Sequence, residues 1–260
     1  MSEGQPEQLA EGTLISHLLE LRTRLMKASL AVVIMFAPCA YFRNDLFTLI
    51  ATPLIERMPK GASMISTSVI APFMVPIKLA ILTAVVLAMP VILYQLWSFV
   101  SPGLYRKEKN FAVPLLISSI VLFYCGVAFA YFLVFPLAFK FLVTVSPVGV
   151  QMMTDMSQYL DFATWMFIAF GAAFEIPIAT ILLLWTGIVT FEAVTKNRGY
   201  VLIGISVVAA FITPPDAISM LLMAVPMYLL YEVGILAARF MLKDKLAAQA
   251  ERAREESTAG

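Results

Sequence analysis

Six long apolar runs alternate with short polar segments along the 260-residue chain. An α-helix rises about 1.5 Å per residue, so about 20 apolar residues cross the roughly 30 Å hydrocarbon core of a bilayer. The runs therefore predict six transmembrane helices, near residues 25–42, 73–99, 111–136, 162–187, 200–213 and 217–238. We interpret residues 13–240 as a single membrane domain that contains all six.

The segments at the two ends of the chain are polar. Residues 1–12 form an acidic N-terminal tail, and residues 241–260 form a charged C-terminal tail. Residues 13–25 carry leucines at helical spacing on one face, which predicts an amphipathic helix before the first span. Its opposite face holds His17, Glu20 and Arg24. The four-residue spacing of Glu20 and Arg24 predicts a weak surface ion pair.

The fifth and sixth runs are expected to form a pair of short helices. The fifth run covers only about 21 Å. Thr213, Pro214, Pro215 and Asp216 follow it at once, and the two prolines must end the helix. A short span beside a tight turn predicts a shallow hairpin or a locally thinned bilayer.

Composition indicates that lipid is the solvent of most of the chain. Hydrophobic residues make up 61% and charged residues 13%, whereas soluble domains carry about 25% charged residues. The net charge of +1 gives no indication of nucleic-acid binding. Cys39 and Cys125 lie inside apolar runs, which predicts two small core residues and neither a metal site nor a disulfide.

The distribution of lysine and arginine predicts that both termini lie in the cytoplasm. In a six-span arrangement with the N-terminus inside, Lys78 falls within a span and the basic residues outside the cell are Arg43, Arg57, Lys60 and Lys140. The cytoplasmic basic residues are then Arg22, Arg24, Lys27, Arg106, Lys107, Lys109, Lys196, Arg198, Arg239, Lys243, Lys245, Arg252 and Arg254. An odd number of spans would place the basic tail outside. The chain is therefore predicted to be a multi-pass membrane protein with both ends in the cytoplasm.

Several enzyme classes are excluded because the residues they need are missing. No G-x-x-x-x-G-K-[ST] loop occurs, which excludes ATP hydrolysis by that route. A Ser–His intramembrane protease needs a histidine at membrane depth, but the only histidine is His17. Asp161 and Asp216 lie at a helix end and in a turn, which does not fit an intramembrane aspartyl protease. We expect no catalytic activity, no metal and no cofactor.

Four carboxylates near the membrane are candidates for function, because charges at membrane depth are costly. Glu20 lies on the amphipathic helix and Glu108 in the loop between the second and third spans, and each alone fits an ordinary surface charge. Asp216 fits either a functional role or the cap of helix six. Glu175 lies near the centre of the fourth span, so it is expected to be protonated, paired or turned toward a wet cavity.

Glu175 leaves two interpretations open. Lys78 is a possible partner, and the sequence weighs structural pairing and direct function equally. A central carboxylate in a proline-interrupted helix also fits a proton-coupled secondary transporter. Against this alternative, the chain has no inverted repeat, and Lys78 is the further ionisable group that we consider beside Glu175.

Four short motifs follow one another along the chain: HLLELRTRL at residues 17–25, SPGLY at 101–105 with Glu108 behind it, FEIP at 174–177 and TPPD at 213–216. Together they resemble the TatC family of twin-arginine translocase subunits. Each is weak alone, but four in this order on a six-span pattern are specific. The resemblance covers about residues 14–240. It implies a concave six-helix bundle that binds paired-arginine signal peptides at the cytoplasmic face and exports folded proteins with the proton-motive force.

The resemblance also implies residue roles and partners. It assigns signal-peptide binding to Glu20, Glu108 and Arg22, and a role in function or assembly to Pro53. It implies single-span partners, TatA and TatB, and a homo-oligomeric receptor complex. The TPPD turn and the start of helix six are implied to dock partners or shape the fold. Family members carry a polar residue at the position of Met220, so the register of the partners does not follow from the resemblance.

The chemistry of arginine agrees with these roles. Its planar guanidinium pairs with a carboxylate through two parallel hydrogen bonds, which lysine cannot copy. Two carboxylates at a membrane interface therefore suit two consecutive arginines, and each charged hydrogen bond contributes about 1.5–3 kcal/mol. The neighbouring Arg106, Lys107 and Lys109 would repel other basic segments.

Overall fold

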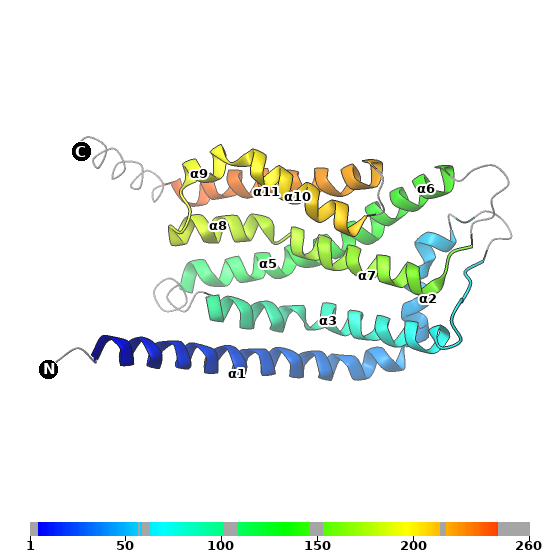
Figure 1. The fold of residues 1–260 in the computed structure, drawn as a ribbon, viewed down its shortest axis with the longest axis horizontal. Coiled ribbons are helices and arrows are strands. Elements are labelled where there is room, and N and C mark those ends of the chain that lie inside the picture. Colours follow the sequence, from blue (N-terminus) through cyan, green and yellow to red (C-terminus); the bar gives the residue numbers. More distant parts are fainter. Residues whose placement is uncertain are drawn as a thin grey trace. The chain divides into compact units, whose positions relative to one another are not determined.

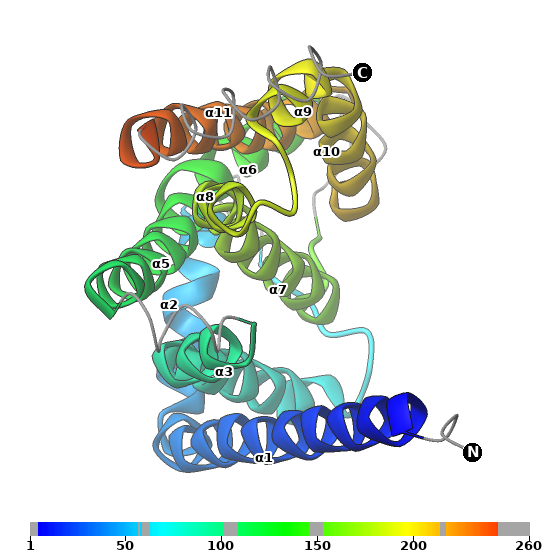
Figure 2. The same cartoon turned by 90° about the vertical axis from the view of Figure 1, so that its left-hand side faces the viewer.

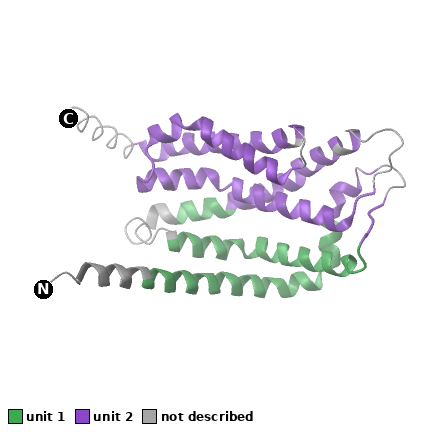
Figure 3. Ribbon diagram, in the orientation of Figure 1, with its two compact units in different colours: residues 1–49, 68–120 green, residues 50–67, 121–260 purple. Residues whose placement is uncertain are grey.

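The structure, a computed structural model, describes residues 5–56, 58, 63–100, 109–145, 153–213 and 217–243. Its helices are α1 (Gln5–Tyr41), α2 (Arg43–Ile55), α3 (Ala71–Val100), α5 (Lys109–Phe129), η1 (Ala130–Val134), α6 (Phe135–Val145), α7 (Met156–Ala173), α8 (Ile176–Thr186), α9 (Phe191–Lys196), α10 (Arg198–Ile212) and α11 (Ala217–Met241) (Figure 1). The chain divides into two compact units, residues 1–49 with 68–120 and residues 50–67 with 121–260 (Figure 3).

In the first unit, α1 and α3 pack side by side along their length (Figure 1). The helix α1 begins at Gln5 and continues to Tyr41. The amphipathic segment and the first predicted span are therefore one helix, and most of the predicted polar tail belongs to it. Small side chains bring the two helices together, because Cys39 clusters with Ala80 and Ala84, both 0% exposed. Small residues allow close approach of helix backbones in lipid. The prediction of Cys39 as a core residue is confirmed.

The sequence analysis did not predict α2. Its 13 residues span about 20 Å, too short to cross the hydrocarbon core. Pro53 lies inside this helix and is buried. In the second unit, the hydroxyl of Tyr159 donates a hydrogen bond to the carbonyl oxygen of Ile50 at 2.5 Å. This bond joins α2 to α7.

The third predicted span continues through α5, η1 and α6, and η1 is a single π-turn. The backbone N–H of Phe135 donates to the carbonyl of Ala130, five residues earlier, so the turn takes up one residue more than an α-turn. Phe135 is fully buried, with its ring centroid 5.1 Å from that of Phe167 and 5.8 Å from that of Phe139. The π-turn therefore lies at the edge of an aromatic core. Cys125 of α5 is exposed, so its prediction as a core residue is wrong.

The fourth predicted span is broken in two. The helix α7 ends at Ala173 and α8 begins at Ile176. Pro177 lies in the first turn of α8 and has no N–H to donate to the carbonyl of Ala173. Glu175 therefore lies at a break between two helices, near the centre of the predicted proline-interrupted span.

The last two predicted helices pack together as α10 and α11 (Figure 2). The 15 residues of α10 cover about 22 Å, which agrees with the expected short span. The 25 residues of α11 cover about 37 Å, so the sixth helix is longer than expected. The helix α11 also packs against α8, where a Cβ atom added to Gly234 would lie 2.8 Å from the Cα atom of Pro177.

Five helical segments among the described residues are long and apolar enough to cross a membrane. They are Ile15–Tyr41, Ala71–Phe99, Val113–Phe141, Met156–Thr186 and Met220–Met241. The shorter apolar helix α10 is the sixth apolar element within the same residues. The predicted fold class, an all-α integral membrane bundle, is confirmed.

Candidate functional site

The first candidate carboxylate, Glu20, already holds a guanidinium group. Arg24 lies one helical turn further along α1, and its Nε and Nη2 atoms donate to the Oε1 atom of Glu20 at 3.0 and 2.5 Å. The side chain of Glu20 is 40% exposed and that of Arg24 is 22% exposed. The predicted surface ion pair is confirmed. Both nitrogens share one carboxylate oxygen, so the pair differs from the two-oxygen fork that an incoming arginine prefers.

An aromatic contact lies one turn before Glu20. The imidazole of His17 stacks on the ring of Phe99 in α3, with the centroids 4.3 Å apart and the planes 20° apart. His17 was predicted to be a solvated residue of the polar face. It is exposed but stacks on an aromatic ring, because the C-terminal end of α3 lies beside the turn of α1 that carries His17.

An apolar groove between α1 and α3 begins beside the Glu20–Arg24 pair. We call this the α1–α3 groove. It has a volume of about 140 Å³, and Leu21, Leu25 and Leu96 are among the residues that line it, with Arg24 at its edge. A charged hydrogen-bonding group therefore lies directly next to an apolar surface within the first unit.

Glu175 lies at the junction of α7 and α8 in the second unit. Its side chain is half-buried and its Oε1 atom is fully buried. Its backbone N–H donates to the carbonyl of Ala172 at 3.1 Å, and its own carbonyl accepts from Ala179 at 2.8 Å. The helix α5 reaches this break closely, since a Cβ atom on Gly126 would lie 2.5 Å from the carbonyl oxygen of Phe170.

The other predicted site residues are dispersed. Arg22 is exposed on α1, and Lys78 is exposed on α3 in the first unit, whereas Glu175 belongs to the second unit. Thr213 is buried and closes α10, with its hydroxyl donating to the carbonyl of Ala209 at 2.8 Å. Met220 is half-buried near the start of α11. Glu108, Pro214, Pro215 and Asp216 lie outside the described residues.

Asp155 is a structural carboxylate that the sequence analysis missed. Its Oδ2 atom accepts hydrogen bonds from the backbone N–H of Thr67 at 2.9 Å and from the Thr67 hydroxyl at 2.8 Å. Its Oδ1 atom accepts from the N–H groups of Ser157 and Gln158 at the start of α7. These hydrogen bonds, those from Thr67 above all, hold the pKa of Asp155 at about 2, below its ordinary value of 3.8. The one available signal was an aspartate followed by an apolar helix, which is typical of an N-cap.

A second missed cluster lies where α10 begins. The Nε and Nη2 atoms of Arg198 each lie 3.0 Å from a carboxylate oxygen of Glu232, which also accepts a hydrogen bond from the Tyr228 hydroxyl. Glu232 and Tyr228 belong to α11. One turn after Tyr228 on this helix, the hydroxyl of Tyr231 donates to the carbonyl of Val194 in α9 at 2.8 Å. Both contacts tie the start of α10 and the end of α9 to α11.

The apolar helices and the carboxylates at their ends and breaks define a multi-pass α-helical membrane protein. Within the described residues, no group of three or more His, Cys, Asp or Glu side chains is placed to hold a metal ion.

Comparison with known proteins identifies the family. The sequence model of the Sec-independent protein translocase protein TatC matches residues 16–226. The chain is 50% identical over 227 residues to the Sec-independent protein translocase protein TatC of Escherichia coli (strain K12), which covers 87% of this chain and 88% of that protein. It is 48% identical over 245 residues to the TatC protein of Azotobacter chroococcum mcd 1, covering 94% and 96%. The chain belongs to the TatC family of Sec-independent protein translocase proteins.

A solved structure agrees with this assignment. The chain matches one described as the crystal structure of the twin-arginine translocase receptor TatC with a TM-score of 0.77 and 37% identity, over 86% of this chain and 98% of that chain. The protein is therefore a multi-pass inner-membrane subunit of the twin-arginine translocase, a transport protein that works within a protein complex. Membership of a translocase family sets aside the alternative of a secondary transporter driven by Glu175.

Proposed function

We propose that this subunit is the receptor that binds paired-arginine signal peptides at the cytoplasmic face of the membrane. The observation that carries the proposal is the Glu20 carboxylate, which two nitrogen atoms of the Arg24 guanidinium already contact. The surroundings of Glu20 thus accept a guanidinium group at hydrogen-bonding distance. Glu108 is proposed as the second carboxylate, and Arg22 as a further residue of the same binding surface.

The α1–α3 groove supports this proposal. A signal peptide consists of a short basic segment followed by 7–15 apolar residues. The pair of Glu20 and Arg24 lies beside the apolar side chains of Leu21, Leu25 and Leu96. The order of charged and apolar surface on α1 therefore matches the order of charged and apolar residues in such a peptide.

The topology proposed here places both termini and Glu20 in the cytoplasm. It depends on the excess of lysine and arginine in the predicted cytoplasmic segments. In this orientation the Asp155 cluster faces the outer side, and the cluster of Arg198 and Glu232 faces the cytoplasm. We further propose that the subunit assembles with TatA, TatB and copies of itself, and that the proton-motive force drives export of folded proteins.

A peptide-binding experiment tests the proposal. Inverted membrane vesicles that carry the protein are incubated with a photoreactive twin-arginine signal peptide, and crosslinking is measured over a range of peptide concentrations. Each of Glu20→Gln and Glu108→Gln is expected to raise the apparent Kd about 10- to 100-fold, because a charged hydrogen bond contributes about 1.5–3 kcal/mol. A peptide with both arginines changed to lysine should bind the wild type as weakly as the twin-arginine peptide binds either variant.

Glu192→Gln is the matched control, because Glu192 is an exposed carboxylate on α9 at the same proposed side of the membrane. It should leave the Kd unchanged. Undiminished binding by both Glu20→Gln and Glu108→Gln would refute the assignment of the carboxylates. Equal affinity for the lysine peptide would refute recognition of guanidinium groups.

A further inference from the structure

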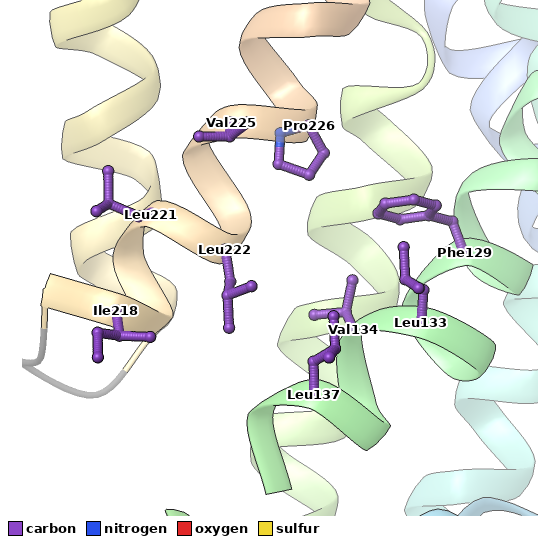
Figure 4. Close-up of a pocket in the computed structure, with 9 residues that line it drawn as sticks. All are labelled: Phe129, Leu133, Val134, Leu137, Ile218, Leu221, Leu222, Val225 and Pro226. Carbon is purple, nitrogen blue, oxygen red and sulfur yellow. The ribbon is translucent and has the colours of Figure 1, made fainter. Parts of the chain in front are cut away.

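A second groove lies between the α5–η1–α6 rod and α11, inside the second unit (Figure 4). We call it the α6–α11 groove. It has a volume of about 360 Å³, within the range of about 300–1,000 Å³ that is usual for ligand sites. Among the described residues, every one that lines it is apolar. Phe129, Leu133 and Leu137 form one wall, and Ile218, Leu222 and Pro226 are part of the other.

Two local irregularities shape the groove. The π-turn η1 widens the helix that carries Leu133. On the opposite wall, Pro226 interrupts the hydrogen bonding of α11 one turn after Leu222. Val134 is 4% exposed at the floor, whereas Leu133 and Leu137 are 46% and 42% exposed. The groove is therefore open at the surface of the second unit, where Leu133 and Leu137 are exposed, and it is closed at its floor by Val134.

A basic residue follows the groove-lining residues along α6. Lys140 is exposed and lies one turn beyond Leu137 on α6. Residues 133, 137 and 140 are spaced by four and three, so they share one helix face. Lys140 is also the penultimate residue of the candidate span Val113–Phe141. A lysine at the end of a span is expected to extend its ammonium group toward the lipid headgroups. Lys140 is the one basic residue in residues 113–186 of the sequence.

The dimensions of the groove match one acyl chain attached to a phosphate. The 12 residues from Phe129 to Lys140 rise about 16 Å, which is about half of the roughly 30 Å hydrocarbon core. The lined part, from Phe129 to Leu137, rises about 12 Å, so a volume of about 360 Å³ gives a mean cross-section of about 30 Å². A helix is about 10–12 Å across with its side chains and would rest on the rims without filling the groove.

From these observations, we propose that the α6–α11 groove is a binding site for a phospholipid. One acyl chain lies between Leu133 and Leu222, and the phosphate group pairs with the ammonium of Lys140. The site uses none of the residues assigned to signal-peptide binding, so it stands or falls independently of the proposed function.

Native mass spectrometry of the purified full-length protein tests the site. The detergent-solubilised protein is titrated with palmitoyl-oleoyl phosphatidylglycerol, phosphatidylethanolamine and, as a probe without a phosphate, palmitoyl-oleoylglycerol. Wild type is expected to retain one phospholipid more tightly than any others. Leu222→Trp fills the groove and should abolish this tight binding. Lys140→Gln should weaken both phospholipids about fivefold and leave the diacylglycerol unchanged.

Matched controls come from surfaces away from the groove. Leu229→Trp adds the same bulk to an exposed position of α11 and should bind like wild type. Lys196→Gln removes a lysine from α9 and should also bind like wild type. If Leu222→Trp does not fold, as judged by thermal unfolding, Val225→Trp in the same α11 wall replaces it.

Two outcomes would overturn the assignment of the groove to a lipid. One is tight lipid retention that Leu222→Trp and Leu229→Trp affect equally. The other is a Leu222→Cys variant that crosslinks in membranes to a protein subunit in high yield, because a protein helix would then occupy the groove. A loss of phospholipid with Lys140→Gln that is matched by an equal loss of diacylglycerol would refute the role of the phosphate.

Discussion

Arg24 occupies the Glu20 carboxylate through two nitrogen atoms that contact a single oxygen, Oε1. In the proposed receptor, an arriving arginine must either displace Arg24 or share the carboxylate with it. Arg24 would then act as an internal competitor that selects for a group able to form two parallel hydrogen bonds. Lysine, a single point charge, gains less from such an exchange.

Replacement of Arg24 tests this competition. Arg24→Ala is expected to lower the Kd for a twin-arginine peptide about two- to fivefold, because an exposed ion pair contributes about 0.2–1 kcal/mol. The same substitution should raise the affinity for a twin-lysine peptide by at least as much. Lys27→Ala, an exposed position on the same helix, is the control for loss of positive charge. Weaker binding of both peptides by Arg24→Ala would show that Arg24 supports the site.

The Asp155 carboxylate predicts a pH dependence of stability. Hydrogen bonds from Thr67, Ser157 and Gln158 stabilise the ionised form, so the pKa of Asp155 is about 2 in the folded protein against an ordinary 3.8. A depressed folded-state pKa means that the stabilisation is complete above about pH 4 and is lost as the pH falls toward 2. Asp155→Asn should therefore lower the melting temperature at pH 7 and flatten its dependence between pH 4 and 2.

Thermal unfolding in detergent across pH 2–7 measures both effects. Asp45→Asn removes an exposed carboxylate from the first turn of α2 and should keep the wild-type profile. Parallel profiles for wild type and Asp155→Asn between pH 4 and 2 would contradict the pKa assignment.

Glu175 is predicted to face water and not lipid. A carboxylate at the α7–α8 break is costly in hydrocarbon, and only a wet or protein-lined position removes most of that cost. In a Cys39→Ala, Cys125→Ala background, Glu175→Cys should react with a membrane-impermeant thiol reagent in vesicles of one of the two orientations. Leu183→Cys, an exposed position on α8, should stay unlabelled. If Glu175→Cys does not react with the reagent in vesicles of either orientation, Glu175 does not face water, and only the interpretation as a buried, paired carboxylate remains.

Close packing beside the α7–α8 break predicts that one added methyl group strongly lowers the stability of the protein. A Cβ atom on Gly126 would lie 2.5 Å from the backbone oxygen of Phe170, which has little freedom to move. Gly126→Ala should reduce the free energy of unfolding by about 1–3 kcal/mol. Gly204→Ala is the control, because no atom lies within 4 Å of its added Cβ and alanine favours a helix by about 0.5–1 kcal/mol. Equal melting temperatures for the two variants would contradict this account of the packing.

The sequence predicted those parts of the fold that depend on apolar length. Spans such as 73–99 match α3 closely, because a run of this kind has few alternatives to a transmembrane helix. The sequence did not predict α2, because its 13 residues lie below the length that hydropathy detects. The π-turn and the exact break at Glu175 depend on how α5, α7 and α11 fit together, and a single sequence does not encode those contacts in any periodic pattern.

The candidate site was predictable to a similar degree. The pair of Glu20 and Arg24 follows from four-residue spacing alone. The stack of His17 on Phe99 joins residues 82 positions apart and required the packing of α1 on α3. Asp155 was overlooked because its partner Thr67 lies in a distant irregular segment. The predicted roles of Glu108 and Asp216 stay predictions.

The π-turn from Ala130 to Val134 also bears on how this protein can change in length. It fits an additional residue into one turn without altering the direction in which later side chains point. Deleting one residue there would convert the π-turn into an α-turn, and the side chains of α6 would keep their directions. A single-residue deletion in the middle of α3 or α11 would instead swing everything beyond it by about 100° and scramble its contacts. Alignment gaps of one residue should therefore be tolerated in this turn and rejected in the regular spans.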